Sequence, residues 1–352
     1  GILGTSNISW WDWVALINSF PQAIFGEKQE IVTGMTQVKL VNENLKWEKL
    51  TQLNAGFDAS LFRSRLNLSL DYFLKETKDV LTPMQILNST GNNGGDPWVN
   101  AATLENQGIE LSVTWRDRIG KDWGYSVNLN GSYLKNKIKE LGYGRKEFTQ
   151  WDTKSKVGNP IGEWYLIKTD GLFRSMDEVM AHRNSEGKLI QPDAKPGDIR
   201  YIDYNNDGVI TDADRQYCGQ TIPKYQLGMN LGLEYKNFDL QIQLSGAFGH
   251  KAYNAARGTY DRFDDNSNYR ADYDPWTPMN PNAKDPRPLY GDSRNTRSDQ
   301  DRWLENGNYL KVKQIALGYN VPKSILGSAI ESIRLYVNAQ NLITFTSYRG
   351  LE

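Results

Sequence analysis

The sequence has few of the residues that most metal and catalytic centres require. Its 352 residues include one cysteine and two histidines, which excludes a disulfide framework, a cysteine-based zinc site and a histidine-rich metal centre. No stretch approaches the roughly 20 consecutive apolar residues of a transmembrane helix. The 41 basic and 42 acidic side chains nearly cancel, so the strongly basic surface of a nucleic-acid-binding protein is excluded as well.

The two histidines also give little reason to expect catalysis. Neither His182 nor His250 lies in a sequence context typical of a nucleophile or a general base. Residues 175–183 predict a short helix with Ser175 as its N-cap, and we expect His182 at the surface there. The sequence therefore predicts that the protein is not an enzyme.

Polar and apolar side chains alternate along much of the chain. Aromatic residues make up 12% of it, which is too many for a disordered chain. Alternation with a period of two predicts β-strands rather than helices. The eight segments with clear alternation are 52–61, 66–74, 109–116, 125–133, 225–235, 238–244, 310–321 and 333–339. Weaker candidates are 31–40 and 163–168.

The links between these segments alternate between short and long. Short links follow Leu61, Arg116, Tyr235 and Val321, and long links cover 75–107, 135–224 and 249–308. This pattern is typical of an antiparallel transmembrane β-barrel with tight periplasmic turns and long extracellular loops. A soluble sandwich would have shorter strands and evenly short loops. The fold class is therefore predicted to be all-β.

Eight strands do not obviously close such a barrel, because closure requires both edge strands to be paired. The chain does not begin with methionine. We therefore expect residues 1–352 to be part of a larger barrel domain in a longer protein. Within it, 135–224 is expected to be one long extracellular loop region.

One strand shows an irregularity in its alternation. Leu310 and Val312 occupy even positions, whereas Ile315 and Leu317 occupy odd positions. A slip of one residue would turn half of the strand's side chains to the wrong face. The sequence therefore predicts a β-bulge near 313–314, which allows both halves to present their apolar side chains to lipid.

Residues 203–214 read DYNNDGVITDAD, similar to an EF-hand calcium loop. Calcium prefers six to eight oxygen ligands, and alternate residues on a tight loop converge on one point. The candidate metal ligands are Asp203, Asn205, Asp207, Val209 (through its carbonyl), Thr211 and Asp214. Position 12 is aspartate rather than glutamate, and flanking helices are missing. A structural calcium ion is the prediction, and a solvated Asp/Asn/Gly turn is the alternative.

Several aromatic residues lie outside the eight clear segments, where they could stack on sugar rings or on peptide side chains. These candidate substrate-binding residues are Trp98, Trp151, Trp164, Tyr165 and Trp276. Packing within the loops is the alternative for each of them.

Several motifs resemble the C-terminal barrel region of SusC/RagA-type TonB-linked outer-membrane transporters. They are NLKWE at 44–48, DYFLKETKD at 71–79, NQGIE at 106–110, GNPIG at 158–162, DGLF at 170–173, GDIRYID at 197–203, NYLKVK at 308–313, LGYNVP at 317–322 and NLITFT at 341–346. The resemblance covers essentially the whole chain. One departure is GLE at 350–352, where family members more often have an aspartate followed by Pro-Glu.

This resemblance implies a 22-stranded barrel that crosses the Gram-negative outer membrane many times and is filled by an N-terminal plug. It also implies a SusD-like surface lipoprotein and energy from the TonB complex through a TonB box. Neither plug nor TonB box is recognisable in 1–352. The expected function is active import of nutrient oligosaccharides. The alternatives are a transporter of the same type for peptides, a passive porin, or a structural surface barrel.

Overall fold

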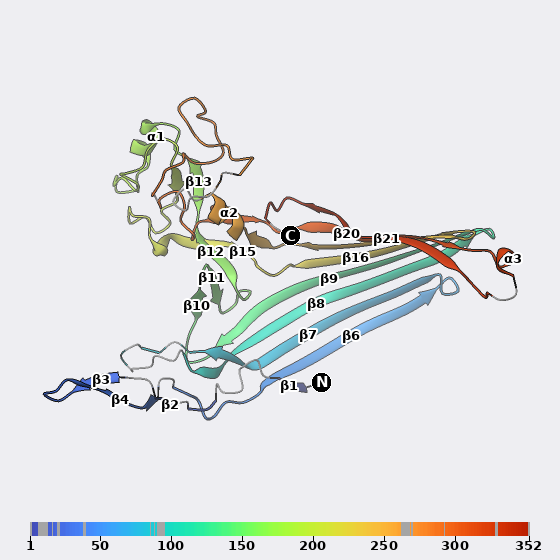
Figure 1. Cartoon of the computed structure of the whole chain (residues 1–352), viewed down its shortest axis with the longest axis horizontal. Coiled ribbons are helices and arrows are strands. Elements are labelled where there is room, and N and C mark those ends of the chain that lie inside the picture. The colour runs from blue at the N-terminus through green and yellow to red at the C-terminus, as the bar shows by residue number, and fades with distance from the viewer. Residues whose placement is uncertain are drawn as a thin grey trace.

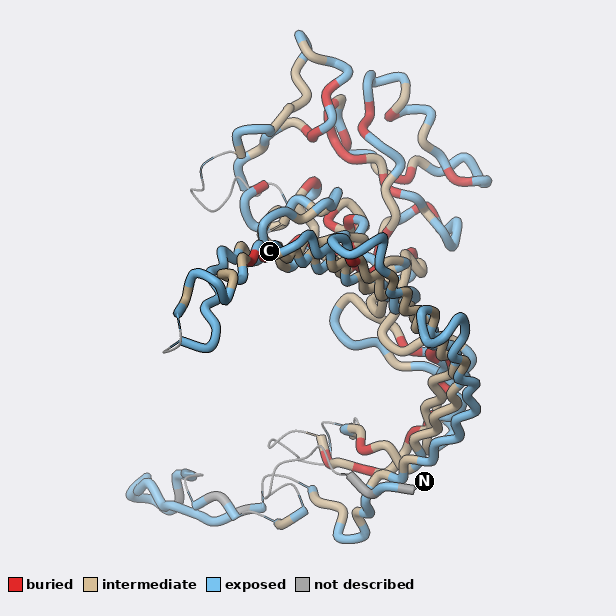
Figure 2. The backbone as a smooth tube through the Cα atoms, turned by 90° about the vertical axis from the view of Figure 1, so that its right-hand side faces the viewer, coloured by how far each residue is buried: buried red, intermediate tan, exposed pale blue. Residues whose placement is uncertain are grey.

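The structure is a computed structural model that describes the chain except for residues 1, 6–12, 16, 20–21, 38–39, 85, 88, 90–95, 262–267, 269, 292, 328–329 and 351–352. Within the described residues, nine strands form one curved antiparallel sheet, in the order β1-β6-β7-β8-β9-β16-β17-β20-β21 (Figures 1 and 2). Their bounds are Ile2–Thr5 (β1), Glu48–Leu61 (β6), Leu66–Pro83 (β7), Trp98–Ile119 (β8), Trp123–Leu141 (β9), Tyr225–Tyr235 (β16), Phe238–Phe248 (β17), Tyr309–Asn320 (β20) and Arg334–Thr346 (β21).

All eight segments with clear alternation form strands of this sheet. Because neighbouring strands are antiparallel, the four short links lie together at one end of the sheet and the long links at the other (Figure 1). β9 pairs directly with β16, so the long segment between them adds no described strand to the main sheet. The predicted short links therefore lie at one end of the sheet and the predicted long links at the other, although the link between β20 and β21 (321–333) is nearly as long as that between β7 and β8 (84–97).

Several strands are longer than the alternation predicted, β7, β8 and β9 most of all. These three contain 18, 22 and 19 residues, so the first long link is 84–97 rather than 75–107, and the second begins at 142 rather than 135. Beyond the apolar band, charged side chains support the pairing: Lys139 Nζ lies 2.8 Å from Glu76 and 3.1 Å from Glu105. Period-two alternation does not detect this strand extension, because its buried apolar side chains do not keep one parity: Ile138 and Leu141 of β9 belong to the same cluster.

The apolar side chains of the sheet lie on its exposed outer face instead of in a core. Leu53, Phe57 and Val337 are 62, 60 and 76% exposed. On β16 this face runs from Tyr225 to Tyr235. At a rise of about 3.4 Å per residue and a tilt of about 40°, the strand spans roughly 26 Å across the membrane, close to the 25 Å apolar band of outer-membrane barrels.

The predicted bulge in β20 is confirmed. Gln314 pairs with Gln243 of β17, whereas the next pair is Val312 with Leu244, so Lys313 is the additional residue. The register against β21 shifts at the same position, between Val312 and Gln314. The bulge restores both halves of β20 to the same apolar face.

The long links form small sheets of their own beside the main sheet (Figure 1). The four-stranded sheet contains β10 (Glu147–Gln150), β11 (Thr153–Lys156), β12 (Glu163–Ile167) and β15 (Arg215–Gly219). Two-stranded sheets join β13 (Thr169–Leu172) with β14 (Ile199–Tyr201), β18 (Lys251–Tyr253) with β19 (Leu304–Asn306), β2 (Ile17–Asn18) with β5 (Thr36–Gln37), and β3 (Gln22–Phe25) with β4 (Glu30–Thr33). The weaker strand candidates thus lie outside the main sheet.

The described helices are short. They are α1 (Met176–Ala181), α2 (Ala255–Tyr260), α3 (Lys323–Leu326) and the 3-10 turns Asp212–Asp214 and Asp301–Trp303. None of the helices in the described part of the chain is long and apolar enough to cross a membrane. α1 confirms the predicted helix, with the Ser175 hydroxyl accepting from the Glu178 N–H. His182, expected at the surface, is instead half-buried, because its ring packs edge-on against Phe173 at 5.4 Å.

Most fully buried side chains lie in the long links. Leu166, Ile167, Phe173, Val179 and Trp303 are at most 1% exposed. The tube view shows this burial gathered in the loop assembly beside the arc of the main sheet (Figure 2). The loops therefore have a hydrophobic core of their own, as an ordered structure of this length requires.

Candidate functional site

The polar face of the main sheet is hollowed along its length. Three open hollows of about 650, 500 and 400 Å³ follow one another over β7, β8, β9, β16 and β17. The middle hollow is lined mainly by neutral groups, with Asn128 and Gln243 on either side of Asn230. Such a wall offers many hydrogen-bond donors and acceptors without strong charge.

Within the middle hollow, short polar side chains connect three strands. The Asn128 amide donates to the Thr114 hydroxyl at 2.7 Å. Its oxygen accepts from the amides of Asn130 at 2.7 Å and Asn230 at 3.3 Å. These contacts fix the amide orientations on the wall. The hollow nearest the short links is more charged: Arg118 lies 3.6 Å from Glu234, and Arg116 is exposed there.

The candidate calcium loop is organised by Asp214. This carboxylate is fully buried. One oxygen accepts from the Tyr204 N–H at 2.9 Å, and the other accepts from the Thr211 N–H at 2.7 Å. The Thr211 hydroxyl in turn accepts from the Ala213 N–H at 3.2 Å, which completes a capping arrangement around the 3-10 turn. The aspartate at position 12 therefore ties both ends of the loop together.

The first half of the loop is a series of side-chain turns. Asp203 Oδ2 accepts from the Gly208 N–H at 2.8 Å, Asn205 Oδ1 from the Asp207 N–H at 3.0 Å, and Asp207 Oδ1 from the Val209 N–H at 2.8 Å. Gly208 has φ +75°, a left-handed conformation that glycine adopts without strain. Ile210 packs against the buried cluster of Ile167, Leu172, Ile199 and Tyr201, as expected from position 8 of such a loop.

One observation bears on whether this loop fits a cation. The second oxygen of Asp203, Oδ1, is buried and has no hydrogen-bond partner among the described residues. A buried carboxylate oxygen without a partner is costly unless something else satisfies it. In the described part of the chain, no three His, Cys, Asp or Glu side chains converge as a metal cluster. A cation would therefore also need the Asn205 amide and the Val209 carbonyl, which the loop supplies.

The five aromatic candidates do not come together at one site. Trp98 is the first residue of β8 and is half-buried, so its expected position outside the strands was wrong. Trp98 lies in the part of β8 that extends beyond the apolar band. Trp276 packs against the cluster around Ile167 and Ile199 as a core residue.

The other three candidates share the four-stranded sheet. Trp151 lies at the turn between β10 and β11, is 88% exposed and has φ +55°. Trp164 stacks on Tyr253 at 5.7 Å, and its indole N–H donates to the Lys251 carbonyl at 3.0 Å. Tyr165 contacts Tyr217 at 5.3 Å. Among these, Trp151 presents an open ring to a ligand or partner.

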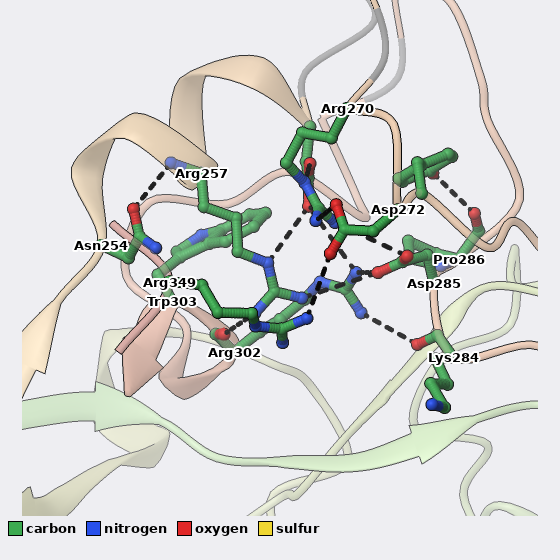
Figure 3. A network of polar contacts seen from close by, with 12 residues as sticks. Asn254, Arg257, Arg270, Asp272, Lys284, Asp285, Pro286, Arg302, Trp303 and Arg349 are labelled. Atoms are coloured by element: carbon green, nitrogen blue, oxygen red, sulfur yellow. Dashed lines mark hydrogen bonds and ion pairs between the residues drawn. The ribbon is translucent and has the colours of Figure 1, made fainter. Parts of the chain in front are cut away.

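A buried ionic network was not predicted from the sequence. Arg257, Arg270 and Arg302 meet the carboxylates of Asp261 and Asp285 between α2 and the following loop (Figure 3). Glu305 belongs to the same network and lies 3.4 Å from Arg257. Burial, together with the charge of Arg257, lowers the pKa of Arg302. The high density of arginine and aspartate in 257–305 is the sequence signal, but it does not reveal which pairs form.

The network also reaches the end of the main sheet. The Arg349 N–H, three residues beyond β21, donates to Glu305 at 2.7 Å, and its guanidinium lies 3.5 Å from Asp272 (Figure 3). The guanidinium groups of Arg257 and Arg302 lie 5.8 and 5.6 Å from the ring of buried Trp303. These contacts connect the last long link to the segment that follows β21.

Comparison with known proteins identifies the family. Residues 16–342 match the model of the TonB dependent receptor-like β-barrel. The chain belongs to this family. It is 32% identical to TonB-dependent receptor P3 of Formosa agariphila and 23% identical to TonB-dependent receptor SusC of Bacteroides thetaiotaomicron, in each case over 100% of the chain. It covers 35 and 34% of those proteins, about a third of their length.

The fold also matches solved structures. The RagAB peptide transporter superimposes with a TM-score of 0.80 at 21% identity, over 99% of this chain and 37% of that one. The chain is therefore of the SusC/RagA type, an outer-membrane barrel segment that crosses the membrane many times through its strands. The family consists of receptors and transporters rather than enzymes, in agreement with the sequence analysis.

Proposed function

We propose that this chain forms part of the barrel wall of a TonB-dependent importer that takes up nutrient oligosaccharides across the outer membrane. The observation that carries the proposal is a strand wall with an apolar outer face and a hollowed amide-rich inner face, in a chain of the SusC/RagA type. The plug and TonB box are proposed to lie in the remainder of the full-length protein. A SusD-like lipoprotein is the proposed partner at the long links.

Oligosaccharides are the first proposed substrate class because the inner wall is rich in neutral hydrogen-bonding groups. Amides such as Asn128 and Gln243 suit sugar hydroxyl groups, which both donate and accept. The open ring of Trp151 adds an apolar surface on the side of the long links.

Peptides are the second proposed substrate class. The structural neighbour with a TM-score of 0.80 is the RagAB peptide transporter, and amide side chains also pair with a peptide backbone. A passive porin or a structural surface barrel would need neither TonB nor a substrate of defined chemistry.

Uptake by the full-length protein distinguishes these functions. A strain lacking the gene is supplied with oligosaccharides or with peptides as the sole nutrient, with and without the restored gene. Restored growth on oligosaccharides alone, abolished when TonB is removed, is the expected result. Growth that persists without TonB would indicate a porin, and growth on peptides alone would assign the second substrate class.

We also propose that residues 203–214 bind calcium with a structural role. The unpartnered Asp203 oxygen supports this, together with the alternating Asp and Asn side chains of the loop. The absence of a bidentate glutamate at position 12 indicates an affinity on the order of 10⁻⁴–10⁻³ M, the range of extracellular modules.

Terbium luminescence, sensitised by the neighbouring tyrosines, tests this proposal in the full-length protein. Calcium should displace terbium at millimolar concentration, and the double variant D203A/D207A should lose the signal. Asp212→Ala, whose side chain is 81% exposed outside the ligand set, is the matched control. An unchanged signal in D203A/D207A would leave the loop as a solvated turn.

A further inference from the structure

Each of the four short links combines an exposed cation with an exposed large apolar side chain. Arg63 follows Phe62, Lys121 is two residues from Trp123, Lys236 precedes Phe238 by two, and Lys323 precedes Ile325 by two. The apolar members are 65, 49, 49 and 71% exposed. The four links lie at the same end of the sheet (Figure 1), so the pairing repeats along one rim.

The aromatic side chains of this rim contact one another across neighbouring strands. Trp123 and Tyr235 have ring centroids 4.3 Å apart, and Phe238 and Tyr319 are 4.7 Å apart. These residues lie on the apolar parity of their strands, which faces lipid. The rings therefore form a girdle at the edge of the apolar band, where aromatic side chains favour the lipid headgroup region.

These four cations lack the ion pairs that two arginines near the same rim form. Arg118 and Arg334 are paired with Glu234 and Asp239 on the polar face. Within the described residues, Arg63, Lys121, Lys236 and Lys323 have no carboxylate partner within 4 Å. All four are exposed, and Lys236 Nζ lies 5.3 Å from the Tyr235 ring, on the lipid-facing side.

The rim also contains carboxylates, although fewer than cations. Asp122 and Glu331 lie in the same short links and are exposed. Four unpaired cations against two carboxylates leave the link surface positive beside the aromatic girdle. A negatively charged group anchored at the membrane surface complements both properties, because it meets the cations while its acyl chains meet the rings.

We propose that this rim binds the phosphate headgroups of anionic phospholipids in the leaflet that faces the short links. The inference rests on the proposed function for the orientation of the barrel, which places these links at the periplasmic leaflet. Each Lys or Arg near an anionic surface contributes about a fivefold preference for that lipid. Glutamine at these four positions is polar but uncharged, so a protein with these substitutions would keep the aromatic girdle and lose the preference for anionic lipid.

Native mass spectrometry of the full-length protein tests the proposal. The protein is released from nanodiscs that contain phosphatidylethanolamine and phosphatidylglycerol, and the lipids that stay bound are counted. The rim variant carries R63Q, K121Q, K236Q and K323Q. The matched control carries the same number of changes at exposed lysines of the long links: K146Q, K156Q, K195Q and K284Q.

The rim variant should retain at least about tenfold less phosphatidylglycerol than the parent, with phosphatidylethanolamine unchanged and the control like the parent. Millimolar inorganic phosphate should not displace the lipid. Equal phosphatidylglycerol retention by the rim variant and the parent would overturn the proposal, as would equal loss in the control. Competition by free phosphate would identify a soluble anion as the ligand instead.

Two further measurements separate this proposal from misfolding and from the proposed function. Lys236→Gln alone should lower retention, and Lys236→Arg should restore it, while both migrate as folded barrels in unheated gels. Uptake assays are independent of lipid counting. If the protein imports nothing but still selects phosphatidylglycerol through the rim, the transport proposal fails and the lipid proposal stands. If the rim variant loses uptake but keeps its lipid, the cations contact a protein partner and the lipid proposal fails.

Discussion

Asp214 shows how one buried acceptor can organise a loop. Its two oxygens accept from the Tyr204 and Thr211 N–H groups, and an unsatisfied buried donor costs about 1–3 kcal/mol. With two such donors, we expect Asp214→Ala to lower the local free energy of opening of 203–214 by about 2–6 kcal/mol. Hydrogen exchange at the Tyr204 and Thr211 amides measures this directly.

Asp212→Ala is the control, because Asp212 is exposed and bonded only at the surface, at 3.2 Å from Arg215. Exposed ion pairs contribute about 0–1 kcal/mol. If both variants accelerate exchange equally, the buried carboxylate does not organise the loop.

His182 predicts a pH dependence in the same loop assembly. Burial lowers its pKa, and the Arg200 charge acts in the same direction, while the hydrogen bond to the Tyr201 carbonyl and the charges of Asp170 and Asp203 offset this only in part. The unfolded chain therefore binds the proton more readily. The contribution of neutral His182 to stability is therefore fully present above the ordinary pKa of about 6.5, and it is lost as the pH falls below that value.

We expect the free energy of opening around α1 to decrease between pH 7 and pH 5, by no more than about 1.4 kcal/mol per pH unit, because one proton is involved. Protection factors corrected for intrinsic exchange measure it. His182→Gln should abolish the dependence, and an unchanged slope in that variant would assign it to another group.

At the scale of elements, the bulge in β20 can be tested by deletion. Removing Lys313 takes out the additional residue and leaves a regular alternation, in which Leu310, Val312 and Ile315 all keep the lipid face. We therefore expect the deletion in the full-length protein to retain a heat-modifiable barrel in the membrane. Lys313→Ala, which keeps the additional residue, should assemble as well. Loss of the barrel in the deletion alone would show that the bulge itself is required, and not only the alternation that it restores.

The ionic network predicts the stability of the last long link. Asp285 is 4% exposed and accepts from Arg302, whose side chain is 11% exposed. Breaking a buried ion pair from one side costs about 3–5 kcal/mol, so Asp285→Ala should make 249–308 sensitive to protease while the strands stay protected. Asp272→Ala, at a side chain 58% exposed, should remain resistant. Equal resistance of the two variants would contradict a structural role for the network.

These elements also show how far sequence reasoning reaches. Alternation predicted the eight main strands and the bulge at 313, because lipid on one face imposes a period of two. It did not reveal the extension of β8 to Trp98, where the long links cover the strands and the buried cluster of Ala102, Ile138 and Leu141 forms. The network around Asp285 was also not foreseen, because it pairs residues up to 77 positions apart whose proximity only the folded loops create. The tight turn at Gly208 could be predicted from the calcium-loop pattern, because the hydrogen bonds from the Asp207 and Gly208 N–H groups go to side chains only two and five residues away.

At the scale of the whole molecule, two environments account for the two kinds of packing. The main sheet leaves its apolar side chains exposed, and the loop assembly buries its own. Lipid would cover the first, while the second meets water and needs a core. This arrangement requires the short links on one side of the membrane and the long links on the other.

Cysteine labelling on intact cells tests this requirement. Asn282 lies in the last long link and Asp122 in the short link between β8 and β9, and both side chains are exposed. In the full-length protein, a membrane-impermeant maleimide should label Asn282→Cys on intact cells and Asp122→Cys only after the outer membrane is permeabilised. The native Cys218 is half-buried and burial raises its pKa, so it should react slowly, and Cys218→Ser provides the background. Equal labelling of both cysteines on intact cells would contradict this topology, and labelling of Asp122→Cys alone would reverse it.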